Sequence, residues 1–240
     1  MKLRSLIGFC ALAVASVAVA EDIVGNTCGL MNVPSTAKTT MIAVPWVTVG
    51  GTADTMKVAN LVKTDTLTAG DELYYYDGTT YFCWKLQDGD WTPTTTASQA
   101  GTYQAPNADY AIARGKGLFL VRKDTSKEIW LYGQHSTEGV SVGITDGTAT
   151  APAYNMIANP NTADYDLNGK KVTGTAGDQI ILGDGTIYSY GSDWTKTVSE
   201  TKTVGGKTVT VKKQSSEGVV IPAGQGAWYV SKGGSPTIVW

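Results

Sequence analysis

The sequence reads Thr68-Ala69-Gly70-Asp71 and, shortly afterwards, Asp77-Gly78-Thr79-Thr80-Tyr81. Both stretches return 107 residues later, as Thr175-Ala176-Gly177-Asp178 and Asp184-Gly185-Thr186-Ile187-Tyr188. Ordered echoes at one offset are typical of an internal duplication. The chain is therefore predicted to contain two related modules in tandem.

Two further echoes flank this stretch in the same order. Met41-Ile42-Ala43-Val44-Pro45 returns as Met156-Ile157-Ala158-Asn159-Pro160, and Gly115-Lys116-Gly117 returns as Gly224-Gln225-Gly226. A Gly-x-Gly sequence binds phosphate when it opens a helix after a strand, but here β-branched and aromatic residues follow it. We therefore expect a turn or a bulge at both copies.

The composition is that of an all-β protein. The chain holds 28 glycines, and long helical periodicity is absent after the first residues. Residues 55–64 fit either one short helix or a strand. We expect each module to be a β-sandwich or a barrel-like sheet, with individual insertions at residues 93–110 and 196–217.

Hairpins are the strongest local prediction. An Asp-Gly pair between alternating residues favours a type I′ turn, in which both central residues have positive φ. It predicts one hairpin from Glu72–Tyr76 to residues 79–86 and another from residues 179–183 to residues 186–190. A third hairpin, at residues 198–211, is rich in threonine and lysine, so we expect it to project into solvent.

Residues 1–20 are typical of a secretory signal peptide. Lys2 and Arg4 precede an apolar run, and Ala18-Val19-Ala20 forms a small-residue cleavage site. A membrane anchor is the alternative, but the run is shorter than the roughly 20 residues of a spanning helix. We predict export to the periplasm, the cell surface or the extracellular space. The predicted parts are a signal peptide (1–20), a first β repeat with an N-terminal extension (21–138) and a second β repeat (139–240).

The charge of the mature chain bears on its partners. Cleavage removes Lys2 and Arg4 and leaves 17 basic residues against 21 acidic ones, a net charge of −4. No basic cluster stands out, so nothing supports binding to nucleic acid. No later segment is apolar enough to be a transmembrane helix.

Two cysteines, Cys28 and Cys83, remain after cleavage. Because an exported chain meets an oxidising compartment, we expect them to form a disulfide. Closing a loop of this length would contribute about 4 kcal/mol in the chain-entropy model. Two free thiols are the alternative.

The repeated motifs resemble those of a largely uncharacterised β-rich module found in secreted and cell-surface bacterial proteins. Its entry motif reads N-x-I-A-N-P, and its exit motif reads P-A-G-Q-G-x-W-V. The match is close at residues 155–160, 177–190 and 222–230 and looser in the first repeat. The resemblance implies export and a β fold, and it implies no reaction.

Catalytic signals are weak. The chain has one histidine, His135, so a Ser-His-Asp or Cys-His arrangement would have to use it, and no nucleophile motif surrounds it. A polysaccharide-active hydrolase with a pair of carboxylates remains an alternative, although most acidic residues lie in turn contexts. We expect a protein without catalytic residues.

One short segment matches half of a calcium-binding loop. Asp164, Asp166 and Asn168 follow the Asp-x-Asp-x-Asn-Gly pattern, which alternates oxygen ligands and places a glycine at the bend. Position 12 of that loop is Thr175 instead of glutamate. The segment is therefore either a calcium site, the one cofactor that the sequence suggests, or a polar turn.

The first hairpin carries aromatic residues that the second lacks: Tyr74, Tyr76, Phe82 and Trp84. Strand alternation puts Tyr74, Tyr76 and Tyr81 on one face and Phe82 and Trp84 on the other. These rings either fill the interface between the repeats or form an exposed platform that stacks on sugar rings.

The expected function is that of an exported, non-catalytic surface protein with a structural, adhesive or ligand-binding role. Its predicted partners are extracellular glycans or components of the cell envelope, and it could also self-associate through edge strands. The hydrolase described above and an outer-membrane β-barrel are the alternatives.

Overall fold

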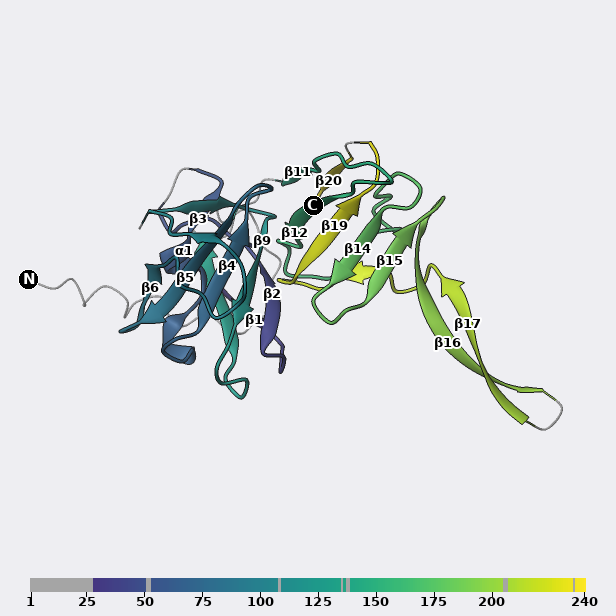
Figure 1. The fold of residues 1–240 in the computed structure, drawn as a ribbon, viewed down its shortest axis with the longest axis horizontal. Coiled ribbons are helices and arrows are strands. Elements are labelled where there is room, and N and C mark those ends of the chain that lie inside the picture. The colour runs from purple at the N-terminus through teal and green to yellow at the C-terminus, as the bar shows by residue number, and fades with distance from the viewer. Residues whose placement is uncertain are drawn as a thin grey trace, which may run out of the picture.

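The computed structural model of the protein describes residues 28–50, 53–107, 109–134, 136, 139–204, 207–234 and 236–240 (Figure 1). The predicted signal peptide and His135 lie outside the described residues. Strands account for 48% of the structure and helices for 3%, which confirms the all-β prediction. Within these described ranges, no helix has the length and hydrophobicity to span a lipid bilayer.

The first half forms one large sheet and two short strand pairs. Its strands are β1 (Cys28–Val33), β2 (Thr39–Ala43), β3 (Thr55–Lys57), β4 (Glu72–Tyr76), β5 (Tyr81–Gln87), β6 (Asp90–Pro93), β7 (Tyr103–Gln104), β8 (Ala111–Ala113), β9 (Gly117–Val121) and β10 (Ile129–Gln134). The large sheet has the order β2-β9-β4-β5-β6, with β7 parallel to β5, while β1 pairs with β10 and β3 with β8. Residues 55–64 contain both predicted alternatives, since β3 leads into the helix α1 (Val58–Leu61), and a 3-10 turn, η2 (Thr64–Thr66), follows.

The second half repeats this arrangement. Its strands are β11 (Ser141–Gly143), β12 (Ala153–Ala158), β13 (Tyr165–Asp166), β14 (Gln179–Leu182), β15 (Ile187–Tyr190), β16 (Trp194–Val204), β17 (Lys207–Ser215), β18 (Val220–Ile221), β19 (Gly226–Ser231) and β20 (Thr237–Val239). The large sheet has the order β12-β19-β14-β15-β16-β17, and the short pairs are β11 with β20 and β13 with β18.

The two halves therefore share one strand order. The path β2-β9-β4-β5-β6 matches β12-β19-β14-β15-β16, and the short pairs match one for one. Both large sheets are open. The first ends at β2 and β6, and the second ends at β12 and β17, so the barrel-like alternative for the modules is wrong. Most echoes in the sequence fall at equivalent places in the two sheets, but Tyr188 pairs with Ile180 as Trp84 pairs with Leu73, so Tyr188 takes the position of Trp84 and not that of Tyr81.

Each half has its own hydrophobic core between the large sheet and the short strand pairs. In the first core, both layers contribute large buried side chains: Leu73, Trp84 and Leu118 from the large sheet, and Met56 and Ile129 from the pairs. The second core is built in the same way from Ile180, Trp194 and Tyr229, together with Ile221 and Ile238. Burial of these apolar surfaces is the main force that holds each half together.

The repeated Thr-Ala-Gly-Asp motif fastens two neighbouring segments in each half. The buried Asp71 carboxylate accepts hydrogen bonds from the backbone N–H groups of Thr68 at 2.9 Å and Lys123 at 2.7 Å. Asp178 accepts the equivalent bonds from Thr175 at 2.8 Å and Lys232 at 2.7 Å. The repetition of this motif thus reflects a structural requirement.

The predicted hairpins form, but the two Asp-Gly turns are not of type I′. Asp77 and Asp184 are absent from the described non-glycine residues with positive φ, while Gly78 has a φ of 109° and Gly185 a φ of 86°. The Asp77 carboxylate instead accepts backbone hydrogen bonds from Thr79 and Thr80, both at 2.8 Å. This aspartate acts as a local acceptor that shapes a longer loop.

The Gly-x-Gly motifs lie where the two halves meet. β2 and β9 of the first half lie against β12 and β19 of the second (Figure 1). The Ala43 N–H donates to the carbonyl of Gly224 at 2.8 Å, and the Ala158 N–H donates to the carbonyl of Gly115 at 2.9 Å. Because Ala43 matches Ala158 and Gly115 matches Gly224 in the echoes, the junction is reciprocal, like a two-fold interface.

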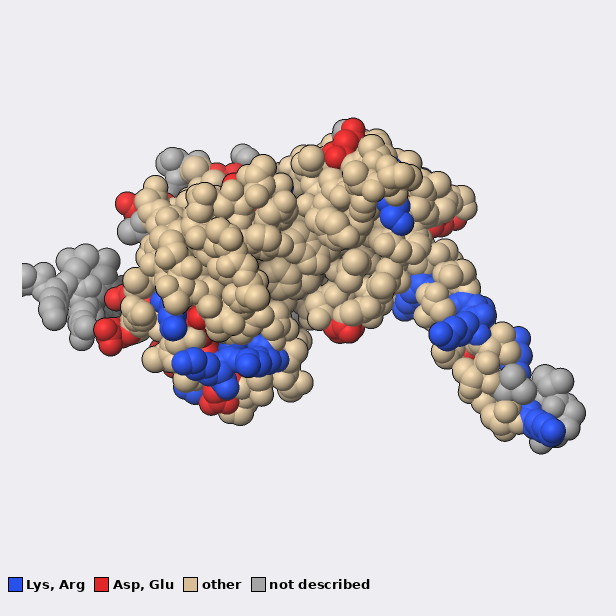
Figure 2. Space-filling view, in the orientation of Figure 1, with Lys and Arg blue, Asp and Glu red and all other residues tan. Residues whose placement is uncertain are grey.

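The insertions of the two halves take opposite courses. Residues 93–110 fold back onto their own sheet, where β7 pairs with β5. Strands β16 and β17 instead form the predicted ribbon, which extends away from the body (Figure 1). Lysine residues are spread along this ribbon (Figure 2).

The predicted disulfide is wrong, because no disulfide joins Cys28 and Cys83 in the described structure. Cys83 is fully buried in a small cluster with Tyr74 and Val121, on the outer face of the large sheet. Strand β1, which carries Cys28, contributes Met31 and Val33 to the main core on the other face. The large sheet therefore lies between Cys83 and β1, the strand that carries Cys28.

Candidate aromatic binding site

The first hairpin sorts its aromatic residues onto two faces, as strand alternation predicts. Tyr74 pairs with Cys83 and Tyr76 with Tyr81 across β4 and β5, so these four residues share the outer face. Trp84, 2% exposed, belongs to the main core, and Phe82 packs against it. The four aromatic residues predicted as one ligand-binding set are therefore divided between the surface and the core.

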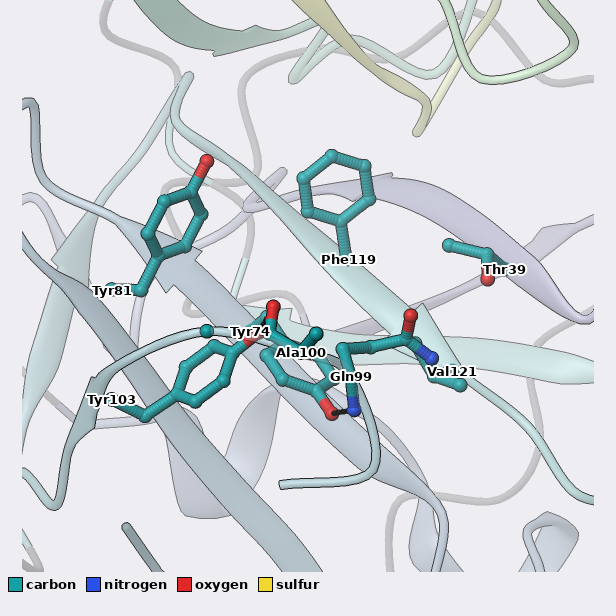
Figure 3. Close-up of a pocket in the computed structure, with 9 residues that line it drawn as sticks. Thr39, Tyr74, Tyr81, Gln99, Ala100, Tyr103, Phe119 and Val121 are labelled. Carbon is teal, nitrogen blue, oxygen red and sulfur yellow. Dashed lines mark hydrogen bonds between the residues drawn. The ribbon is translucent and has the colours of Figure 1, made fainter. Parts of the chain in front are cut away.

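The outer face carries a cavity of about 330 Å³. Aromatic rings form much of its wall, and Figure 3 shows the rings of Tyr81, Tyr103 and Phe119 arranged around it. The full lining consists of Thr39, Tyr74, Tyr81, Gln99, Ala100, Gly101, Tyr103, Phe119 and Val121. None of these nine residues is an acid or a base.

Residues of the insertion close one side of the cavity, and Glu72 holds them there. The carboxylate of Glu72 is buried and accepts hydrogen bonds from the Tyr74 hydroxyl, the Ser98 hydroxyl and the Ser98 N–H. Lys85 lies 3.8 Å from it. The insertion is thus fixed to the sheet by a carboxylate below the cavity.

The ionisation of this group follows from its surroundings. Burial tends to raise the pKa of Glu72, but the hydrogen bonds from Ser98 and Tyr74 outweigh burial and hold the pKa below its usual value. Burial and the bond to Glu72 raise the pKa of Tyr74, which stays a protonated donor. Glu72 is therefore an ionised, fully engaged acceptor, unlike a general acid, which needs a raised pKa.

The aromatic surface continues beyond the cavity. Ring centroids lie 6.2 Å apart between Tyr103 and Tyr81, 4.6 Å between Tyr81 and Tyr76, and 5.9 Å between Tyr76 and Trp228 of the second half. Tyr154 lies 6.1 Å beyond Trp228. We call these five residues the aromatic row.

Sequence reasoning missed most of this surface. Tyr81 recurs in the sequence as Tyr188 and so is not among the extra aromatic residues of the first hairpin, and Tyr103 lies in an insertion without a counterpart. Phe119 and Trp228 carried a usable signal, because each stands two residues after the last glycine of its Gly-x-Gly motif. Their rings meet at 5.7 Å across the junction, a contact that depends on how the halves pack.

The residues of the calcium hypothesis each bind a different part of the chain. Asp164 accepts a hydrogen bond from the Ala223 N–H at 3.1 Å, and Asp166 accepts from the N–H groups of Asn168 and Gly169. The Asn168 amide donates to the carbonyls of Trp194 and Ser216. No group of three or more His, Cys, Asp or Glu side chains suited to a metal ion occurs in the described part of the chain.

A second, larger cavity of about 640 Å³ lies at the junction of the halves. Its lining includes the matching prolines Pro45 and Pro160, as well as Arg114. The Arg114 guanidinium is buried and donates to Asp54 at 2.8 Å and to the Ser136 carbonyl at 3.2 Å. Both partners belong to the first half, so these contacts fix the Arg114 side chain in one wall of the cavity.

The aromatic cavity offers both apolar faces and hydrogen-bonding groups. Its rings offer apolar faces, and the Thr39 hydroxyl and the Gln99 amide offer hydrogen bonds. No carboxylate lines it. Comparison of the chain with known protein families, curated proteins and solved structures finds no match.

Proposed function

We propose that this protein is an exported, non-catalytic surface protein that binds a glycan in the aromatic cavity of its first half. The observation that carries this proposal is the cavity itself: Tyr74, Tyr81, Tyr103 and Phe119 line it, and no charged residue does. The apolar C–H faces of sugars stack on such rings, while their hydroxyl groups bond to amides and hydroxyls. A concave, largely apolar site with a few polar groups is typical of ligand binding.

Exposure supports the same interpretation. Tyr81 is 38% exposed, and Phe119 and Tyr103 are half-buried. Aromatic side chains that gather at a surface without being needed for the core usually mark an interaction site. The equivalent hairpin of the second half forms its sheet with Ile181 at the position of Tyr74.

The proposal includes the finer fold prediction. We infer that residues 21–138 and 139–240 arose from one duplicated β module, each a large sheet packed on short strand pairs. The shared strand order, the repeated Asp71 and Asp178 contacts and the reciprocal junction support this origin. The predicted signal peptide supports a location outside the cytoplasm.

The test is a glycan-binding screen of residues 21–240 against a broad array, with bound affinities measured by calorimetry. The variant is Tyr81→Ala/Phe119→Ala, because both side chains line the cavity and neither is fully buried. Trp84→Ala is unsuitable, since its core position would unfold the protein. The matched control is Ile187→Ala, which removes an exposed apolar side chain from the equivalent hairpin of the second half.

We expect wild type and the Ile187→Ala control to bind the same glycan, and the double variant to lose at least about tenfold in affinity. Circular dichroism spectra should show that all three proteins are folded. If folded, monodisperse wild type binds no glycan, or if the double variant binds as well as wild type, the proposal is wrong.

A further inference from the structure

The aromatic row crosses from one half of the molecule to the other. Tyr103, Tyr81 and Tyr76 belong to the first half, and Trp228 and Tyr154 to the second. The cavity holds only the first two of these five residues. A ligand confined to the cavity would therefore leave the rest of the row unused.

The far end of the row is exposed and is not part of either core. Tyr154 is 52% exposed, and Trp228 is half-buried. Tyr154 pairs with Val230 as Thr39 pairs with Val121, so Tyr154 stands where the first half has the threonine of the cavity wall. The second half thus places an exposed aromatic ring at this position.

The rings of the row form one continuous apolar surface. Neighbouring centroids lie between 4.6 and 6.2 Å apart, and neighbouring ring planes are inclined by 31° to 90°, so the rings contact one another, mostly edge to face. Successive aromatic side chains along a surface are also how proteins bind other extended polymers. The row and the cavity lining hold no Asp, Glu, Lys, Arg or His residue, so nothing in this surface favours a charged sugar.

We propose that the ligand is a linear, uncharged polysaccharide that follows the aromatic row across the junction, with the cavity holding one segment of the chain. This inference rests on the glycan binding proposed above and specifies its substrate class. Trp228 and Tyr154 bind additional sugar units, so the protein recognises the length of the chain as well as its composition. The reciprocal junction fixes the two parts of this binding surface relative to each other.

The test uses ladders of uncharged oligosaccharides, from disaccharide to hexasaccharide, of β-1,4-glucan, β-1,3-glucan, β-1,4-mannan, β-1,4-xylan and chitin. Oligogalacturonates of the same lengths serve as the charged comparison. Dissociation constants are measured for wild type, for Tyr154→Ala and for Trp228→Ala/Tyr154→Ala. Tyr154→Ala changes one exposed side chain, so it keeps the test valid if loss of Trp228 disturbs the junction.

For a ladder that binds, the affinity of wild type should rise by at least about tenfold from disaccharide to hexasaccharide. Both variants should keep the disaccharide affinity and lose part or all of this gain. Equal affinity for all lengths, an unchanged gain in both variants, or a preference for oligogalacturonates would overturn this inference while glycan binding stands. Absence of binding to every ladder and every array glycan would overturn the proposed function itself.

Discussion

The two halves of the molecule use one strand order to present two different outer faces. In the first half, Tyr74 and Tyr81 point outward under an insertion that folds over the sheet. In the second half, Ile181 stands at the position of Tyr74, and its cross-strand partner is the exposed Ile187, where Tyr74 faces the buried Cys83. The contacts that hold the fold are repeated, whereas the surface positions have diverged.

The two insertions take different courses, and the equivalent residues Glu72 and Gln179 differ in charge. Glu72 begins β4 and fastens the first insertion through Ser98, and the equivalent Gln179 begins β14 without a carboxylate. The second insertion leaves the body as the ribbon of β16 and β17. The half with a charged acceptor on its sheet is thus the half whose insertion folds back. The predictions below test this comparison of the two halves.

The largest effect is expected at the matching tryptophans Trp194 and Trp91. Trp194 is fully buried, and its indole N–H donates to the Val172 carbonyl at 2.9 Å. The indole N–H of Trp91 is buried and has no hydrogen-bond partner among the described residues. Replacement of either by alanine should cost about 3–5 kcal/mol of unfolding free energy, because each leaves a large cavity.

Replacement by phenylalanine separates the two positions. Trp194→Phe leaves the Val172 carbonyl without its donor and should cost about 1–3 kcal/mol more than Trp91→Phe. Urea denaturation followed by circular dichroism measures both. Equal losses for the two phenylalanine variants would show that the hydrogen bond to Val172 contributes nothing.

A second effect concerns the junction. A Cβ atom at Gly117 would lie 2.7 Å from the Ile157 carbonyl oxygen, and one at Gly226 would lie 3.1 Å from that of Ile42. Gly117→Ala should therefore destabilise the protein by about 1–3 kcal/mol, and Gly226→Ala by less. Thermal unfolding and limited proteolysis between the halves are the measurements.

The control for the junction is Gly143→Ala in β11, where a Cβ atom would meet nothing within 4 Å. It should leave both the unfolding temperature and the proteolysis pattern unchanged. If Gly117→Ala behaves like this control, the close backbone approach does not hold the halves together.

Sequence reasoning predicted what depends on local chemistry and missed what depends on packing between distant segments. The β-rich halves, the hairpins and the shared face of Tyr74, Tyr76 and Tyr81 follow from repeats and strand alternation, which act over a few residues. The disulfide was wrong because the side of the sheet on which Cys83 lies relative to β1 is a tertiary property. Trp228 was missed for the same reason, since it joins the candidate site only through the junction.

A smaller effect is expected from Glu72→Gln, which removes the charged acceptor under the first insertion. Loss of charge-assisted hydrogen bonds should cost about 1–2 kcal/mol at pH 7 and should raise hydrogen exchange in residues 97–101. Because folding lowers the pKa of Glu72, its contribution is present above the ordinary glutamate pKa of about 4.3 and is lost as the pH falls further. Wild type and variant should therefore converge in stability below about pH 4.

The matched control for that prediction is Gln179→Ala, at the equivalent position of the second half. Its difference from wild type should not depend on pH between 7 and 3, since glutamine does not titrate. A Glu72→Gln variant whose difference from wild type is equally constant would contradict the assigned role of the carboxylate.

The last prediction concerns the chemical reactivity of Cys83 and involves no substitution. Burial raises the pKa of its thiol to about 12, and the thiolate is the form that reacts with alkylating agents. At pH 8 the native protein should react with iodoacetamide at Cys83 roughly 1,000-fold more slowly than the same residue in urea, because a thiol in water has a pKa near 8.5. Peptide mapping by mass spectrometry measures both rates and also detects any Cys28–Cys83 disulfide in the purified protein. In the structure, Cys83 is buried in a cluster with Tyr74 and Val121. Such a disulfide, or rapid labelling of native Cys83, would contradict this burial.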